Sequence, residues 1–202
     1  AKLLANVFGA IRYVYNLGLN LKIDQYERNK DKPKEEREKA LTAFDLINFL
    51  PGLKKQEKTS FLKDVPSIPL QFANRNLQSA FKNFFDRMKK GTKEKGHPKF
   101  KSRFNKQSFQ FHQDYKIDFN NNKFFIPKIG EVKCIYHRHF IGETKTCTIS
   151  KNASQQYFVS ILVNESLPVI EKAKIKEDTT IGVDWGVNSF ISLSNGEKVD
   201  NF

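Results

Sequence analysis

The chain has 202 residues, 39% of them hydrophobic and 28% charged, which is the composition of a folded globular protein and not of a disordered one. No apolar run approaches the ~20 residues that a membrane-spanning helix needs, and we expect no secretory signal because no charged-then-apolar stretch opens the sequence. The 35 Lys and Arg residues against 22 Asp and Glu residues give a net charge of +13, which favours a polyanionic partner. Cys134 and Cys147 form no CxxC pair. We therefore expect a cytoplasmic protein that contacts nucleic acid and not a membrane, with no zinc site within these residues.

The first part of the chain is predicted to be helical. Apolar residues recur at helical spacing from the start, at positions Leu3, Leu4, Val7, Phe8, Ile11, Val14, Tyr15 and Leu19. A charged loop at 30–38 leads to a second helix that would bury Leu41, Phe44, Ile47 and Leu50 and end at Pro51-Gly52. A third helix would begin with Ser67 as its cap and Pro69 in its first turn, and end at Gly91.

Beyond Gly91 the periodicity changes to the alternation of short antiparallel strands. The predicted strands are 109–111, 115–119, 124–127, 132–140, 144–150 and 157–163. Five or more such strands favour a small barrel or sandwich. A polar linker at 164–179 should then lead to a hairpin made by 180–184 and 189–194, where the net charge changes sign.

Residues 89–106, called the basic segment below, hold eight basic residues and one acidic residue, a net of 8 − 1 = +7. Phe100, Phe104, Phe109 and Phe111 lie within it or just beyond it. Cations neutralise phosphates and exposed rings can stack on bases, so this pattern indicates nucleic-acid binding. The alternative is a solvated loop whose phenylalanines anchor it to the strands.

The motif Ile-Gly-Val-Asp-Trp-Gly at 181–186 puts Asp184 at the end of an apolar strand, between two glycines. The first strand of an RNase H-like fold presents a metal-binding Asp in this way, although any hairpin can carry an Asp near its turn. His137 and His139 would share one face of a strand, but no third ligand lies near in sequence, so we interpret them as structural. His112 follows the basic segment and could hydrogen-bond a base or a phosphate.

Four motifs in order resemble the TnpB family: RYVYN at 12–16, LQSAFKNFF at 77–85, GHPKFK at 96–101 and IGVDWG at 181–186. TnpB proteins are RNA-guided nucleases encoded by bacterial and archaeal insertion sequences, long described as transposases and related to type V CRISPR effectors. The resemblance covers essentially the whole chain. It implies an α+β fold with a helical recognition lobe at 1–95, an antiparallel β-barrel wedge domain at 96–176 and the first strands of an RNase H-like (RuvC) domain at 177–202.

The resemblance also implies roles for single residues. Asp184 matches the first RuvC carboxylate, a catalytic residue and a ligand of Mg²⁺. Gln71 lies where the family contacts the short duplex motif that flanks its target, and Asn74 belongs to the same predicted interface. His112 and Gln113 lie where the barrel joins that contact. The remaining predicted nucleic-acid contacts are Lys99, Lys101 and Arg103 of the basic segment.

The function expected from the resemblance is that of the N-terminal part of an RNA-guided DNA endonuclease, which binds guide RNA and target double-stranded DNA beside a flanking motif. The other nuclease carboxylates and a zinc ribbon would follow Phe202. Magnesium is therefore expected in the full-length parent and zinc in the missing C-terminal part, and this chain alone is not expected to cut DNA. The alternatives are a nuclease-dead RNA-guided repressor and a basic RNA-binding β-barrel protein without nuclease activity.

Overall fold

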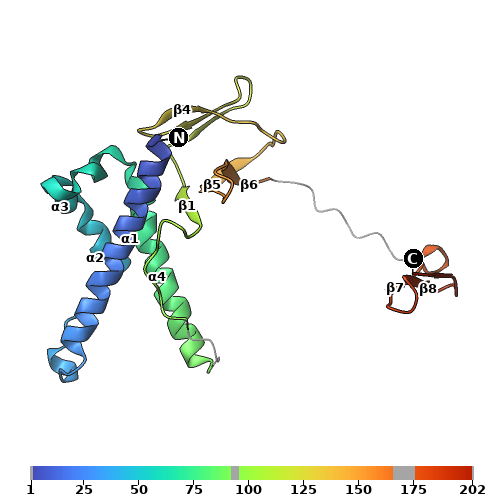
Figure 1. The fold of residues 1–202 in the computed structure, drawn as a ribbon, viewed down its shortest axis with the longest axis horizontal. Coiled ribbons are helices and arrows are strands. Elements are labelled where there is room, and N and C mark those ends of the chain that lie inside the picture. Colours follow the sequence, from blue (N-terminus) through green and yellow to red (C-terminus); the bar gives the residue numbers. More distant parts are fainter. Residues whose placement is uncertain (1, 92–95, 166–175, 202) are drawn as a thin grey trace. The chain divides into compact units, whose positions relative to one another are not determined.

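The computed structural model describes residues 2–91, 96–165 and 176–201 (Figure 1). The chain divides into two compact units, residues 1–165 (unit 1) and residues 166–202 (unit 2). Most of the predicted linker at 164–179 lies outside the described residues, as does residue 95 at the predicted end of the helical lobe. The division of the chain into a recognition lobe, a wedge domain and a nuclease domain stays a prediction. None of the helices in the described ranges has an apolar stretch that could span a bilayer.

Unit 1 is built on a long first helix, α1 (Lys2–Asn29), which packs against α4 (Ser67–Lys89). Between them come α2 (Ala43–Asn48), α3 (Leu50–Lys55) and two short 3₁₀ segments, Lys34–Glu36 and Glu57–Asp64. The predicted stripe of α1 is buried except for Leu3, which confirms its helical period. A side chain at Gly18 would meet Asn74 and Leu77 of α4 at about 3.1 Å, so glycine permits the close approach of these two helices.

The predicted second helix is wrong in its end and in its buried face. It is two helices, because Pro51 does not stop the first but lies in the opening turn of α3, where a missing N–H costs little. A capping box starts α2: Thr42 Oγ1 accepts from the Asp45 N–H, and Asp45 Oδ2 accepts from the Thr42 N–H at 2.8 Å. Leu50 is buried as expected, but Phe44 is 69% exposed and Leu46 is buried in its place.

The third predicted helix is α4, and Gly91 ends it with a φ of +65°. Ser67 does not cap it. Pro66 takes the N-cap position without a side-chain hydrogen bond, and Ser67 Oγ instead accepts from Lys54 Nζ at 2.8 Å. Leu70, Ala73 and Leu77 recur at helical spacing in α4 and are buried.

The strands of unit 1 form two antiparallel sheets of three strands. One has the order β1 (Gln107–Phe111), β5 (Glu143–Lys151) and β6 (Tyr157–Asn164), and the other β2 (Lys116–Asp118), β3 (Lys123–Ile126) and β4 (Gly130–Lys133). Neither closes into a barrel within the described residues, so the barrel stays a prediction. The predicted strand at 132–140 is wrong beyond Lys133, where the chain becomes irregular.

Helices and sheets of unit 1 share one core. Phe109 and Phe111 of β1 are buried, opposite Ile149 and Cys147 of β5. The ring of Phe8 on α1 lies 5.0 Å from that of Phe109. The alternation in β1 therefore buries its two rings between the sheet and the helices.

Unit 2 is a small antiparallel sheet of β7 (Val183–Trp185), β8 (Ile191–Leu193) and β9 (Lys198–Val199), after a 3₁₀ turn at Glu177–Thr179. The predicted hairpin is confirmed. Gly182 N–H donates to Ser194 Oγ and Ser194 N–H donates to the Gly182 carbonyl, each at 2.9 Å. The sheet leaves Val183 52% and Trp185 69% exposed.

Candidate nucleic-acid interface

From residue 96 the basic segment has no regular secondary structure, and its start is fastened to α4. Arg87 Nη2 donates to the Gly96 carbonyl at 3.0 Å. The His97 ring meets the rings of Phe81 and Phe84 edge-on, with centroids 5.5 and 5.2 Å apart. The aromatic stretch of α4 therefore holds the start of the GHPKFK motif.

One side chain of α1 fixes the middle of this segment. Asn16 Oδ1 accepts from the Lys101 N–H at 2.8 Å, and Asn16 Nδ2 donates to the Lys101 carbonyl at 2.9 Å. The amide thus pairs with both backbone groups of a residue 85 positions away, as a neighbouring strand would. Two of the motifs quoted above, at 12–16 and at 96–101, meet in this contact.

The Lys101 side chain also packs against α1, which bears on its predicted contact with nucleic acid. Its ammonium lies 4.2 Å from the centroid of the Tyr15 ring, and burial lowers the pKa of this lysine. A cation above a ring is held by the electrostatic field of the π system. The Lys101 ammonium therefore already has a partner within the fold, and Lys101 is a weaker candidate for a phosphate contact than Lys99 or Arg103.

Lys99, Lys101 and Arg103 are all exposed, and Lys99 and Arg103 lack the contact that holds the Lys101 ammonium on the Tyr15 ring. The Arg103 guanidinium lies 4.9 Å from the Phe104 ring, which is 84% exposed, and Phe100 is 54% exposed. Phe100 and Phe104 are thus available for stacking, whereas Phe109 and Phe111 belong to the core. Lys93 and Lys95 lie outside the described residues.

A second group forms where the start of α4 meets the end of β1. The ring of Phe72, next to Gln71 in α4, lies 5.5 Å from the ring of His112, and the Arg75 guanidinium lies 5.6 Å from the same Phe72 ring. Gln71 is half-buried, and His112 and Gln113 are exposed. The structure therefore brings together segments that the sequence separates by some 40 positions, and it adds Phe72 and Arg75. The sequence pattern did not single out Phe72 and Arg75, because neither lies on the buried face of α4 that Leu70, Ala73 and Leu77 form.

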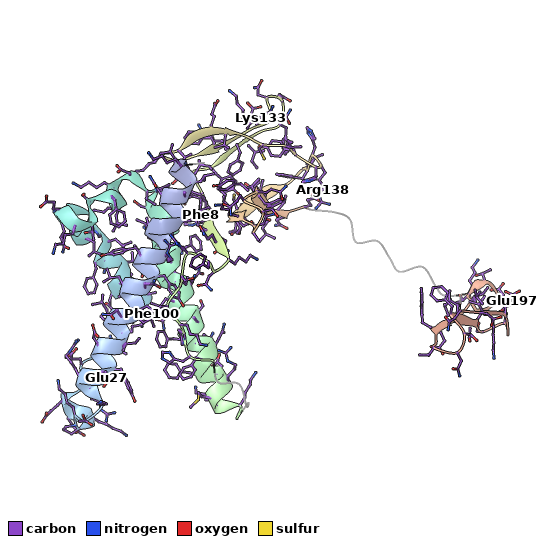
Figure 2. All side chains as sticks on the ribbon, viewed as in Figure 1. Phe8, Glu27, Phe100, Lys133, Arg138 and Glu197 are labelled. Carbon is purple, nitrogen blue, oxygen red and sulfur yellow. The ribbon has the colours of Figure 1, made fainter. Side chains whose placement is uncertain are left out.

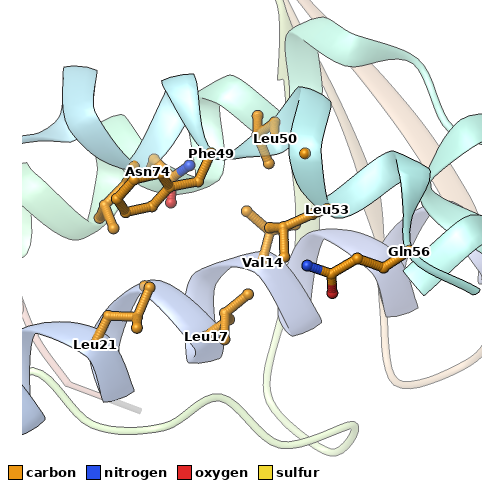
Figure 3. Close-up of a pocket in the computed structure, with 11 residues that line it drawn as sticks. Val14, Leu17, Leu21, Phe49, Leu50, Leu53, Gln56 and Asn74 are labelled. Carbon is orange, nitrogen blue, oxygen red and sulfur yellow. The ribbon is translucent and has the colours of Figure 1, made fainter. Parts of the chain in front are cut away.

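Asn74 does not belong to this surface. It is 1% exposed and lines an apolar cavity of about 340 Å³ between the first four helices, with Val14, Leu46 and Leu53 among its neighbours (Figure 3). Its Nδ2 has no hydrogen-bond partner among the described residues. The predicted contact of Asn74 with nucleic acid is therefore not supported, because its amide is covered by α1.

Asp184 lies in the middle of β7, opposite Ser192 of β8, with its side chain exposed. Within the ranges that the structure describes, no three His, Cys, Asp or Glu residues lie close enough to hold a metal ion together. The described residues therefore gather no set of metal ligands around Asp184.

The family model of the helix-turn-helix domain named HTH_OrfB_IS605 matches residues 1–31, of which Lys2–Asn29 form the single helix α1. The chain is 30% identical over 198 residues to a protein of Escherichia coli strain K12 named "Putative RNA-guided DNA endonuclease InsQ". It is 29% identical over 202 residues to a Streptomyces pristinaespiralis protein named "Putative RNA-guided DNA endonuclease". These matches cover 96% and 98% of the chain but 44% and 46% of the relatives, so the chain spans about half their length.

Proposed function

We propose that the chain is the part of a TnpB-family RNA-guided DNA endonuclease that holds guide RNA and reads a short DNA motif beside the target, a proposal that its similarity to two proteins named as such endonucleases supports. In such a protein base pairing between guide and target supplies most of the sequence recognition, and the protein needs to read few bases itself. The proposal is consistent with a chain of net charge +13 whose exposed cations include Lys99 and Arg103.

The observation that carries the proposal is the fixed path of residues 96–101 of the basic segment. A phosphate-binding strand is effective when its backbone is held and its cations point to solvent, because ordering it then costs little on binding. Asn16 and the aromatic stretch of α4 hold this backbone, and Lys99 and Arg103 remain exposed. RNA phosphates would follow the basic segment, and Phe100 and Phe104 could stack on unpaired bases.

The group at the start of α4 is the proposed reader of the flanking motif. Glutamine can pair bidentately with the edge of adenine in the major groove, and arginine and histidine can bind phosphates or bases beside it. Gln71, Arg75 and His112 lie around Phe72 in this arrangement. Gln113 follows His112 directly and extends the same surface.

Unit 2 would contribute Asp184 to cleavage in the whole protein. In a two-metal nuclease, magnesium ions bound by carboxylates activate water and stabilise the leaving oxygen. The described residues gather no such ligand set around Asp184, so we derive no cleavage step from them. A three-stranded sheet with Val183 and Trp185 exposed also needs further structure to cover its apolar face.

The test is the salt dependence of RNA binding by the double variant Lys99→Ala, Arg103→Ala. We expect weaker binding and a log–log salt slope that is smaller by about 0.7 for each phosphate that the variant no longer neutralises. The matched control is Lys34→Ala, Lys58→Ala, which removes two exposed lysines from the 3₁₀ segments. A folded double variant whose RNA binding has the salt slope of the parent would exclude the basic segment from the RNA interface.

A further inference from the structure

The chain between β4 and β5 forms an irregular segment at residues 134–141, called the 134–141 loop here. Two hydrogen bonds fasten its first half to the last residue of the turn before β3 and to the first residue of β3. The Cys134 N–H donates to the Asn122 carbonyl at 2.8 Å, and Tyr136 Oη donates to the Lys123 carbonyl at 2.7 Å. The loop is therefore a held surface of unit 1 although it has no regular secondary structure.

Phe119 supports a cluster of rings from this loop. The His139 imidazole stacks on it, with centroids 4.5 Å apart and planes at 26°. Tyr136 and Phe140 meet the same ring edge-on at 4.8 and 5.2 Å. Those two and Phe119 are half-buried, whereas His139 is exposed. The imidazole is thus backed on one side by a fixed ring and remains in contact with solvent.

The loop exposes both apolar and cationic side chains. Ile135 is 81% exposed and Ile141 is 92% exposed. His137 and Arg138 are also exposed, and Figure 2 labels Arg138 on this loop. Isolated apolar side chains are common on surfaces, but two isoleucines this exposed beside a supported imidazole and an arginine indicate an interaction site.

The charges around the loop favour an anionic partner. No Asp or Glu occurs between Glu131 and Glu143, and these two pair with Lys123 at 2.5 Å and Lys145 at 2.6 Å. Among the described residues Arg138 has no ion pair, so its charge is available to a ligand.

Stacking distinguishes between anionic ligands. A supported planar ring can stack on an unpaired base, with the neighbouring isoleucines covering the base and sugar. The bases of a duplex already stack on one another and present only their edges. Unpaired nucleic acid therefore fits this surface better than duplex or an acidic protein.

We propose that the 134–141 loop is a second nucleic-acid contact, distinct from the basic segment, where His139 on Phe119 stacks on an unpaired base and Arg138 binds a neighbouring phosphate. The inference rests on the proposed function, since it assigns one more RNA contact to the same protein. The sequence pattern did not predict this site, because it placed His137 and His139 on a strand and not in a loop.

The experiment measures binding of a labelled oligouridylate of about ten nucleotides, within the usual site size of such proteins, and of the same strand paired with its complement. We expect His139→Ala to weaken single-strand binding about five- to hundredfold, the range measured when one stacked base loses its platform. His139→Phe keeps the ring and should bind within about threefold of the parent. Arg138→Ala should lower the salt slope by about 0.7, the value for one phosphate.

Controls separate stacking from general losses. Phe158→Ala removes a ring that is 47% exposed on β6 and has no ring contact among the described residues, and Lys34→Ala removes an exposed cation elsewhere. Neither should change binding by more than about twofold. Each variant is melted beside the parent, and photocrosslinking of the parent to bromouridine RNA should label residues within 135–141 even if a variant fails to fold.

Several outcomes would overturn the inference. The first is single-strand binding by His139→Ala at the affinity of the parent, and the second is an equal loss of affinity in His139→Phe and His139→Ala. The others are an equal loss of affinity for the duplex and for the single strand, and crosslinks that lie outside the loop. An effect of the loop variants on binding to an acidic protein but not to RNA would assign the surface to a protein partner. A parent that binds no RNA at all would instead contradict the proposed function, so the two failures are distinguishable.

Discussion

Replacing Asn16 by alanine should separate the role of the backbone contact from the role of charge. The variant removes two hydrogen bonds to Lys101, at 2.8 and 2.9 Å, and deletes no charged group. A hydrogen bond of this kind contributes about 0.5–1.5 kcal/mol net, so the pair contributes at most about 3 kcal/mol. Because water can replace part of it at this half-exposed position, we expect a loss of about 1–2 kcal/mol of unfolding free energy.

The matched control is Asn20→Ala, one turn further along α1. Its amide donates to Asp24 Oδ2 at 2.8 Å within the same helix, an interaction of about 0.2–0.5 kcal/mol. Both substitutions gain the same helix propensity, roughly 0.5 kcal/mol, so this gain cancels in the comparison. The difference between the two variants therefore isolates the tie to the basic segment.

The assay is urea unfolding followed by far-ultraviolet circular dichroism, which reports mainly on the helices of unit 1. Asn16→Ala should be less stable than Asn20→Ala by about 1–2 kcal/mol. It should also bind RNA more weakly with the salt slope of the parent, because every cation is still present. Equal stabilities of the two variants would refute the reasoning, and a changed slope would show that Asn16 itself contacts the ligand.

Three further predictions concern other parts of the chain. Gln71→Ala should cost about 1–3 kcal/mol of discrimination at one base of the flanking motif and leave RNA binding unchanged, which a library of flanking sequences would reveal as the disappearance of a preference at that position. In the whole protein, Asp184→Ala should abolish magnesium-dependent cleavage while RNA binding and the melting temperature stay near those of the parent; cleavage at the parental rate would exclude Asp184 as a metal ligand. Burial raises the pKa of the Cys147 thiol from 9.0 to about 12, so the unfolded chain loses this proton first as pH rises. The free energy of unfolding should therefore fall between pH 9.0 and 12. It should fall less steeply with pH in Cys147→Ala, even though the smaller side chain also changes the free energy of unfolding by an amount that does not depend on pH.

Local sequence patterns determined much of this fold. The spacing of Leu4, Val14 and Leu19 predicted which face of α1 is buried, and the alternation of Phe109 and Phe111 predicted their inward position. The turn around Gly186 predicted the hairpin of unit 2. These features follow from the periods of helix and strand, which depend on neighbouring residues alone.

The surroundings of the polar side chains were determined by the tertiary structure alone. Asn16 and Asn74 are both asparagines on helices, yet one ties down Lys101 while the other is enclosed between α1 and α4. His139 became part of a supported ring surface because Phe119, twenty positions earlier, lies beneath it. Whether a polar group is exposed, paired or covered depends on which distant segments pack beside it, and no local period encodes that packing.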